Sequence, residues 1–135
     1  GERRLPLILQ NLHRYFLYLA VIFLFVLARD VWDALWFTDA SGQVSFGVGV
    51  GTLLLAANVV LLGGYTLGCH SMRHLVGGAL DRLAHRPLRK TAYDCSSCLN
   101  RAHLKWAWTS LMMVPFCDLY IRLCSMGIWH DVRLF

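Results

Sequence analysis

The sequence predicts an all-α integral membrane protein with three transmembrane helices and a cytoplasmic amino terminus. Hydrophobic residues make up 57% of the 135 residues, and the mean hydropathy is +0.50, whereas soluble domains are usually about 45–50% apolar. Three segments are apolar enough to cross a bilayer, and most basic residues lie on one side of them. We therefore expect residues 1–135 to form a single transmembrane anchor domain. Because the chain begins with glycine and shows no signal-peptide pattern, we expect a processed product or a piece of a longer anchor.

The first predicted span covers residues 14–36. Its core, Tyr15–Ala28, carries no charged residue. This core is shorter than the roughly 20 residues that a crossing helix needs. The span therefore depends on Trp32 and Trp36 to continue it into the membrane interface, where tryptophan is favoured.

The second and third predicted spans cover residues 46–69 and 106–126. The second span is the strongest because it contains 24 residues without a charge. The third contains Asp118 and Arg122, which stand four residues apart on one helical face. We expect these two side chains to form an ion pair.

The distribution of basic residues gives the spans a direction. Segment 37–45 has one acidic residue and no basic one, whereas segment 70–105, predicted to be a loop, and the amino-terminal segment are rich in bases. The positive-inside rule places both basic segments in the cytoplasm and the carboxyl terminus outside. A nucleic-acid partner is not expected, because that function needs basic residues on a folded soluble surface. The basic residues of the two segments are Arg3, Arg4, Arg14, Arg73, Arg82, Arg86, Arg89, Lys90, Arg101 and Lys105.

Cysteine and histidine residues are concentrated at the predicted cytoplasmic loop. Thiolates and imidazoles are the ligands of zinc and of iron–sulfur centres, and in a reducing compartment a Cys-x2-Cys pair is typical of a metal site. The spacing leaves open a closed zinc site, a [2Fe–2S] cluster with two cysteines and two histidines, a b haem, or no metal. Spacing alone favours zinc, because the Rieske pattern of Cys-x-His and Cys-x2-His is missing from the sequence and no span carries a histidine at its middle. The candidate ligands are Cys69, His70, His74, Cys95, Cys98 and His103.

Two short motifs resemble those of known membrane anchors. The segment 10–14, Gln-Asn-Leu-His-Arg, resembles the Ser-x-x-His-Arg that opens the first helix of succinate dehydrogenase cytochrome b subunits. The segment 71–74, Ser-Met-Arg-His, resembles the Gly-Ile-Arg-His near the end of their second helix. The resemblance implies a bacterial plasma-membrane anchor for a flavoprotein subunit and an iron–sulfur subunit. Quinone would be reduced at the cytoplasmic interface, and succinate would be oxidised on a partner subunit.

The resemblance also implies roles for individual residues. Quinone would bind beside Arg14, with Gln10 in place of the family's serine and His13 nearby. A fixed cation at Arg14 would stabilise the negative charge that develops on a quinone oxygen. Leu67 occupies the position of the family's axial haem histidine.

The additional cysteines resemble the actinobacterial type of anchor, which is similar to one carrying a Rieske-type cluster. The resemblance therefore implies a [2Fe–2S] cluster in place of the haem. We expect its ligands to be Cys95, Cys98, His70 and His103, with His74 and Cys69 in reserve.

Two other functions remain open from the sequence: a structural membrane scaffold stapled by zinc, and a b-haem quinone oxidoreductase subunit. The basic cluster within segment 70–105 also has two interpretations. It can bind anionic membrane lipids, at about 1 kcal/mol per charge, or form a docking surface for a soluble iron–sulfur subunit. The cluster consists of Arg82, Arg86, Arg89 and Lys90.

Overall fold

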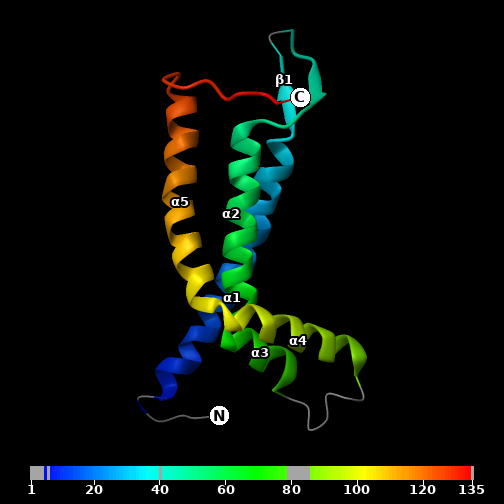
Figure 1. The fold of residues 1–135 in the computed structure, drawn as a ribbon, viewed down its shortest axis with the longest axis vertical. Coiled ribbons are helices and arrows are strands. Elements are labelled where there is room, and N and C mark those ends of the chain that lie inside the picture. The colour runs from blue at the N-terminus through cyan, green and yellow to red at the C-terminus, as the bar shows by residue number, and fades with distance from the viewer. Residues whose placement is uncertain (1–4, 6, 40, 79–85, 135) are drawn as a thin grey trace.

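In the described part of the chain, three long helices stand side by side and two shorter helices lie across one end (Figure 1). The computed structural model describes residues 5, 7–39, 41–78 and 86–134, with only the backbone of Leu7 and Gln10. The long helices are α1 (Leu7–Asp33), α2 (Val50–Leu67) and α5 (His103–Ser125). The short helices are α3 (His70–Gly77) and α4 (Pro87–Arg101). At the opposite end, β1 (Trp36–Thr38) and β2 (Val44–Phe46) form an antiparallel hairpin in which Phe37 pairs with Ser45.

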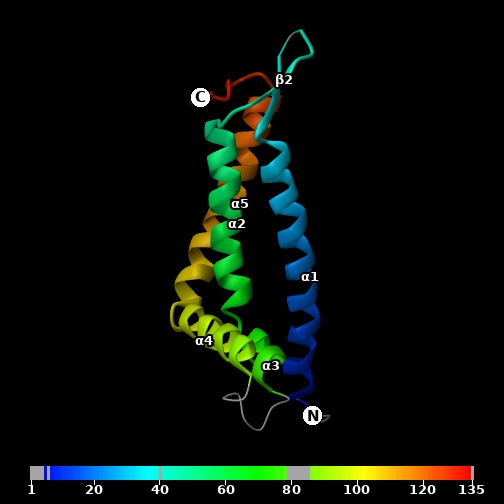
Figure 2. The same ribbon diagram turned by 90° about the vertical axis from the view of Figure 1, so that its right-hand side faces the viewer.

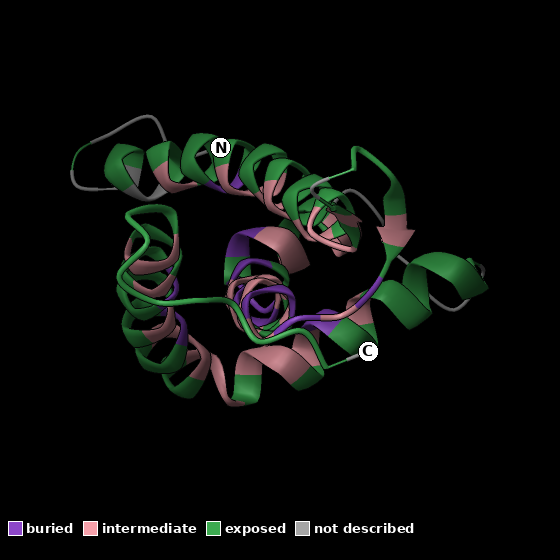
Figure 3. Cartoon of the chain, turned by 90° about the horizontal axis from the view of Figure 1, so that it is seen from above, coloured by how far each residue is buried: buried purple, intermediate pink, exposed green. Residues whose placement is uncertain are grey.

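Helix α2 occupies the centre of the bundle and packs against both α1 and α5 (Figures 2 and 3). Glycine allows the close approach to α5, since a Cβ atom added at Gly64 would lie 2.7 Å from the ring of Trp106. On the other side, the Thr52 hydroxyl donates a hydrogen bond of 2.8 Å to the carbonyl of Ala34, just beyond α1. Small and polar side chains of α2 thus join the three long helices.

The hydrophobic core is thin. Within the described residues, the buried apolar side chains are Leu17, Cys69 and Cys117 alone. Large apolar side chains instead face outward, with Phe25 74% exposed and Val60 64% exposed. Apolar surface of this extent indicates a face that lipid or another membrane protein covers.

Two described helices are long and apolar enough to cross a membrane: residues Asn11–Asp33 of α1 and the whole of α2. Helix α5 is long enough, but the charges of Lys105, Asp118 and Arg122 lower its mean hydropathy. The third span therefore stays a prediction. The expected ion pair within it is confirmed, because Arg122 Nε lies 2.7 Å from an Asp118 carboxylate oxygen.

Segment 70–105 is not the loop that the sequence predicted, because most of its described part forms α3 and α4. Helix α4 instead closes the end of α2, whose last carbonyls have no partner inside their own helix. Ser96 donates to the Leu67 carbonyl at 2.8 Å, and Asn100 donates to the Gly68 carbonyl at 2.7 Å. Arg82 of the predicted basic cluster lies outside the described residues.

Helix α2 is also shorter than the predicted span 46–69. Its amino end starts at Val50, because Phe46 pairs in the hairpin and Gly49 is extended. Its carboxyl end stops at Leu67, and Cys69 adopts an extended conformation before α3 begins. The helix is therefore broken at the point where the sequence changes from apolar residues to candidate ligands.

Candidate functional site: a histidine and cysteine cluster at a helix break

The break between α2 and α3 places one cysteine against the first part of α1. Cys69 precedes the first turn of α3 with φ −65° and ψ 141°, so its side chain projects away from the axis of α2. It is only 4% exposed. Since α1 packs against α3, a side chain on the inner face of α1 can reach the thiol.

His13 is that side chain. Its Nε2 atom lies 3.0 Å from Cys69 Sγ, and the same sulfur lies 3.9 Å from His70 Nδ1. The rings of His13 and His70 are stacked, with centroids 5.3 Å apart and planes 5° apart. One thiol and two imidazoles therefore offer ligand atoms that all lie within 4.8 Å of one another. We call His13, Cys69 and His70 the junction cluster.

Two further histidines, His74 and His103, lie near the junction cluster. His74 meets the His70 ring edge-on at 6.3 Å, and the ring of His103 stacks on Tyr65 at 4.7 Å. Burial lowers the pKa of His70, and repulsion from His13, His74 and His103 lowers it further. This direction favours the neutral imidazole of His70, which is the form that can bind a metal ion.

The other predicted ligands do not join this cluster in the described structure. Cys95 and Cys98 are exposed on α4, whose inner face carries Ser96 and Asn100. At 100° per residue, both cysteines point well away from that face. Within the described residues, the only group of three candidate ligand atoms is the junction cluster, so His103 is not part of such a group.

The predicted quinone-binding residues are divided between the inside and the outside of α1. His13 faces inward and belongs to the junction cluster. Arg14 is exposed, about 100° further around the helix. The side chain of Gln10 lies outside the described residues.

Several contacts that hold the site could not be found in the sequence. Arg73 donates to the Tyr93 hydroxyl at 2.9 Å, and its guanidinium lies 5.2 Å from the centre of the Tyr93 ring. It also donates to Asn100 at 3.5 Å. These bonds fix α3 against α4. Pattern analysis missed them, because Tyr93 and Asn100 belong to no motif.

Apolar helices with exposed outer faces, joined at one end to a polar platform of α3 and α4, define the chain as a helical membrane anchor. The chain belongs to the family of the actinobacterial succinate dehydrogenase subunit SdhC, whose family model matches residues 1–127. No curated protein matches the chain.

Among solved structures, the chain is similar to one in the Mycobacterium smegmatis Sdh1 complex in the apo form, with 41% identity and a TM-score of 0.83. The match covers 100% of this chain and 49% of that chain. The chain therefore spans about half the length of its structural relative.

Proposed function

We propose that the chain is a membrane anchor of a succinate:quinone oxidoreductase. It would hold a flavoprotein subunit and an iron–sulfur subunit at the membrane, and quinone would be reduced at its cytoplasmic end. Membership of the SdhC family and similarity to a protein of an Sdh1 complex support this function. The observation that carries the proposal is the junction cluster, since it gathers titratable and ligating side chains at the end of α1 where the family motif lies.

The proposed topology has three spans formed by α1, α2 and α5, with the amino terminus and the platform in the cytoplasm of a bacterium. Exposed basic residues at the platform support this direction, because basic residues are retained on the cytoplasmic side. The hairpin at the other end has no basic residue between Phe37 and Ser45. The exposed bases of α4 and its flanks are Arg86, Arg89, Lys90, Arg101 and Lys105.

Quinone would bind beside Arg14, one residue along α1 from His13, which belongs to the junction cluster. Arg14 is exposed on the outer surface of α1, so a neighbouring subunit or the lipid phase would complete the site. Its charge can stabilise a quinone oxygen as electrons arrive.

A Rieske-type cluster does not fit the arrangement of the described residues. Such a cluster needs two cysteines on one iron and two histidines on the other, whereas the junction cluster offers one cysteine. The two cysteines of α4 are exposed and point away from it.

A single transition-metal ion fits the junction cluster better. With metal–sulfur and metal–nitrogen bonds of about 2.3 and 2.0 Å, two ligands of a tetrahedral ion lie roughly 3.5 Å apart. The separations of 3.0 and 3.9 Å bracket this value. Three protein ligands would leave the fourth position for water or another ligand. This geometry also supports the second candidate function, a zinc-stapled scaffold, because the ion would tie α1 to α3.

Purification through an affinity tag on this chain tests the proposed function. From membranes of cells that express the chain together with its partner subunits, a flavoprotein and an iron–sulfur protein should co-elute, and the eluate should reduce a soluble quinone with succinate. Elution of the chain alone, with bound zinc and without succinate oxidation, would favour the scaffold. Metal analysis of the same sample separates zinc from iron and from haem.

A further inference from the structure

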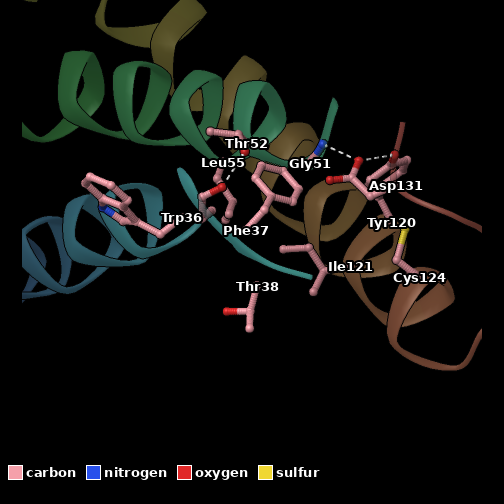
Figure 4. A pocket seen from close by; sticks show the side chains of 11 residues that line it. Trp36, Phe37, Thr38, Gly51, Thr52, Leu55, Tyr120, Ile121, Cys124 and Asp131 are labelled. Carbon is pink, nitrogen blue, oxygen red and sulfur yellow. Dashed lines mark hydrogen bonds between the residues drawn. The ribbon is translucent and has the colours of Figure 1, made fainter. Parts of the chain in front are cut away.

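A cavity lies at the end of the bundle opposite the junction cluster. Figure 4 shows its lining side chains from close by. It encloses about 360 Å³ between the end of α1, the hairpin, the start of α2 and the end of α5. Gly51 and Thr52 form its buried floor, and exposed Trp36, Thr38 and Ile121 form part of its rim. The volume is in the range of small-ligand sites, and nothing in the proposed quinone chemistry uses it.

Among the polar groups of this cavity, the carboxylate of Asp131 offers a ligand one hydrogen-bond acceptor and a negative charge. One oxygen of Asp131 accepts hydrogen bonds from the Gly51 amide at 2.8 Å and from the Tyr120 hydroxyl at 2.9 Å. The other oxygen points toward Phe37 and makes no hydrogen bond within the described residues (Figure 4). The Thr52 hydroxyl already donates to Ala34. The hydroxyls of Thr52 and Tyr120 are thus already used as donors, whereas a ligand that carries an ammonium group finds a carboxylate.

Aromatic rings and a guanidinium complete the charge pattern. Phe37 and Tyr120 line the cavity, and ring faces attract ammonium groups. The guanidinium of Arg133 lies 5.1 Å from the centre of the Phe37 ring, and it donates to the Ser45 hydroxyl at 3.1 Å and to the Phe46 carbonyl at 2.9 Å. Asp131 also borders this ring, since a Cβ atom added at Gly49 would meet both Phe37 and Asp131 within 3.2 Å. The negative charge of Asp131 and the positive charge of Arg133 therefore both lie beside the Phe37 ring. This arrangement suits a zwitterionic ligand, which carries one charge of each sign.

The cavity lies at the depth of a membrane interface. Trp32, Trp36 and Phe46 form edge-to-face contacts with centroids 6.0 and 5.7 Å apart beside it, and tryptophan concentrates at that depth. Leu55 and Ile121 line the cavity with apolar surface. We infer that this cavity binds the headgroup of a zwitterionic phospholipid with a primary ammonium, of the phosphatidylethanolamine class. The ammonium would lie against Asp131 and the phosphate toward Arg133.

Native mass spectrometry of the purified chain, in the complex that it forms, tests this inference without an activity assay. The sample is exchanged into micelles that contain equal amounts of phosphatidylethanolamine and phosphatidylglycerol with identical acyl chains. The unchanged protein should retain phosphatidylethanolamine in excess. Asp131→Asn, whose amide oxygen can still accept the bonds from Gly51 and Tyr120, should reduce that excess about tenfold through loss of a charge-assisted bond.

Asp30→Asn is the matched control, because it removes an exposed acidic charge near the same end without lining the cavity. It should leave the excess unchanged. Ile121→Trp narrows the cavity from its exposed rim and should reduce the retention of both lipids. This second variant keeps the inference testable if the Asp131→Asn protein does not fold. Equal retention of the two lipids by the unchanged protein would overturn the inference. An excess that survives Asp131→Asn, or a retained quinone in place of lipid, would also overturn it.

Discussion

The Nε2 atom of His13 lies 3.0 Å from the sulfur of Cys69, although 56 residues separate them in the sequence. This contact joins the first helix to the break between the second and third. At this break Cys69 is buried and His13 is half-buried. Any ion or proton held at this point is therefore in contact with two elements at once.

The first prediction concerns metal at the junction cluster. Cys69→Ser should lower the bound zinc or iron of the purified protein by at least about tenfold, because a hydroxyl is a much weaker ligand than a thiolate. Elemental analysis by mass spectrometry measures this. The double variant Cys95→Ser, Cys98→Ser is the control and should keep the metal, since both cysteines are exposed on α4.

A Rieske-like electron paramagnetic resonance signal that disappears in the Cys95→Ser, Cys98→Ser protein would contradict the three-ligand site. Such a result would instead support the ligands predicted from the sequence, namely Cys95, Cys98, His70 and His103. His74→Ala adds a second comparison, because His74 contacts His70 but stands outside the junction cluster.

The second prediction concerns the packing of α2 against α5. Gly64→Val should destabilise the protein by roughly 1–3 kcal/mol, because its Cβ would lie 2.7 Å from the Trp106 ring. Gly63→Val is the matched control, since a Cβ there meets nothing within 4 Å. Thermal unfolding in detergent compares the two. Equal midpoints would show that α2 and α5 do not pack as described.

The third prediction concerns the platform. Asn100→Ala should cost about 1 kcal/mol or more, because it removes the bond to the Gly68 carbonyl at the end of α2 and the longer bond from Arg73. It should also speed the exchange of amide hydrogens in α3 and α4. Thr91→Ala serves as control, since that hydroxyl bonds only the Pro87 carbonyl within its own exposed helix. If the amide hydrogens of α3 and α4 exchanged at the same rate in Asn100→Ala, other contacts would stabilise the platform.

The fourth prediction concerns the basic cluster of the sequence, Arg82, Arg86, Arg89 and Lys90. Changing all four to Gln should reduce co-purification of the iron–sulfur subunit, if an acidic surface of that partner docks here. A smaller pair, Arg89→Gln with Lys90→Gln, can be matched to Arg29→Gln with Arg122→Gln at the opposite end. Quantitative immunoblots of the eluates measure the effect. An intact complex after all four changes would leave these residues a role in lipid binding alone.

The sequence predicted the helical class and the family because both depend on local patterns. Uncharged runs mark α1 and α2, and the motif around His13 and Arg14 is contiguous in the chain. The Asp118–Arg122 pair was also predictable, since four residues bring two side chains together on one helix.

The site itself was less predictable because its contacts join distant elements. The Cys-x2-Cys spacing at 95 and 98 suggested chelation, but the packing of α4 on α2 turns its serine and asparagine inward instead. His13 was assigned to quinone, and nothing in its neighbours indicates that it meets Cys69. That contact depends on the break after Leu67 and on the packing of α1 against α3.

The last prediction concerns the proposed quinone site. Arg14→Ala should lower succinate:quinone reduction by at least about tenfold, because fixed charges at a developing oxyanion are worth roughly 10²–10³ in closed sites and less at an exposed one. Succinate oxidation with an artificial soluble acceptor should stay nearly unchanged, since that electron transfer bypasses the membrane quinone. Arg29→Ala is the matched control, because Arg29 is an exposed arginine on the same helix at its far end. If both activities fell together in Arg14→Ala, the arginine would serve assembly, and quinone would have to be reduced elsewhere on the complex.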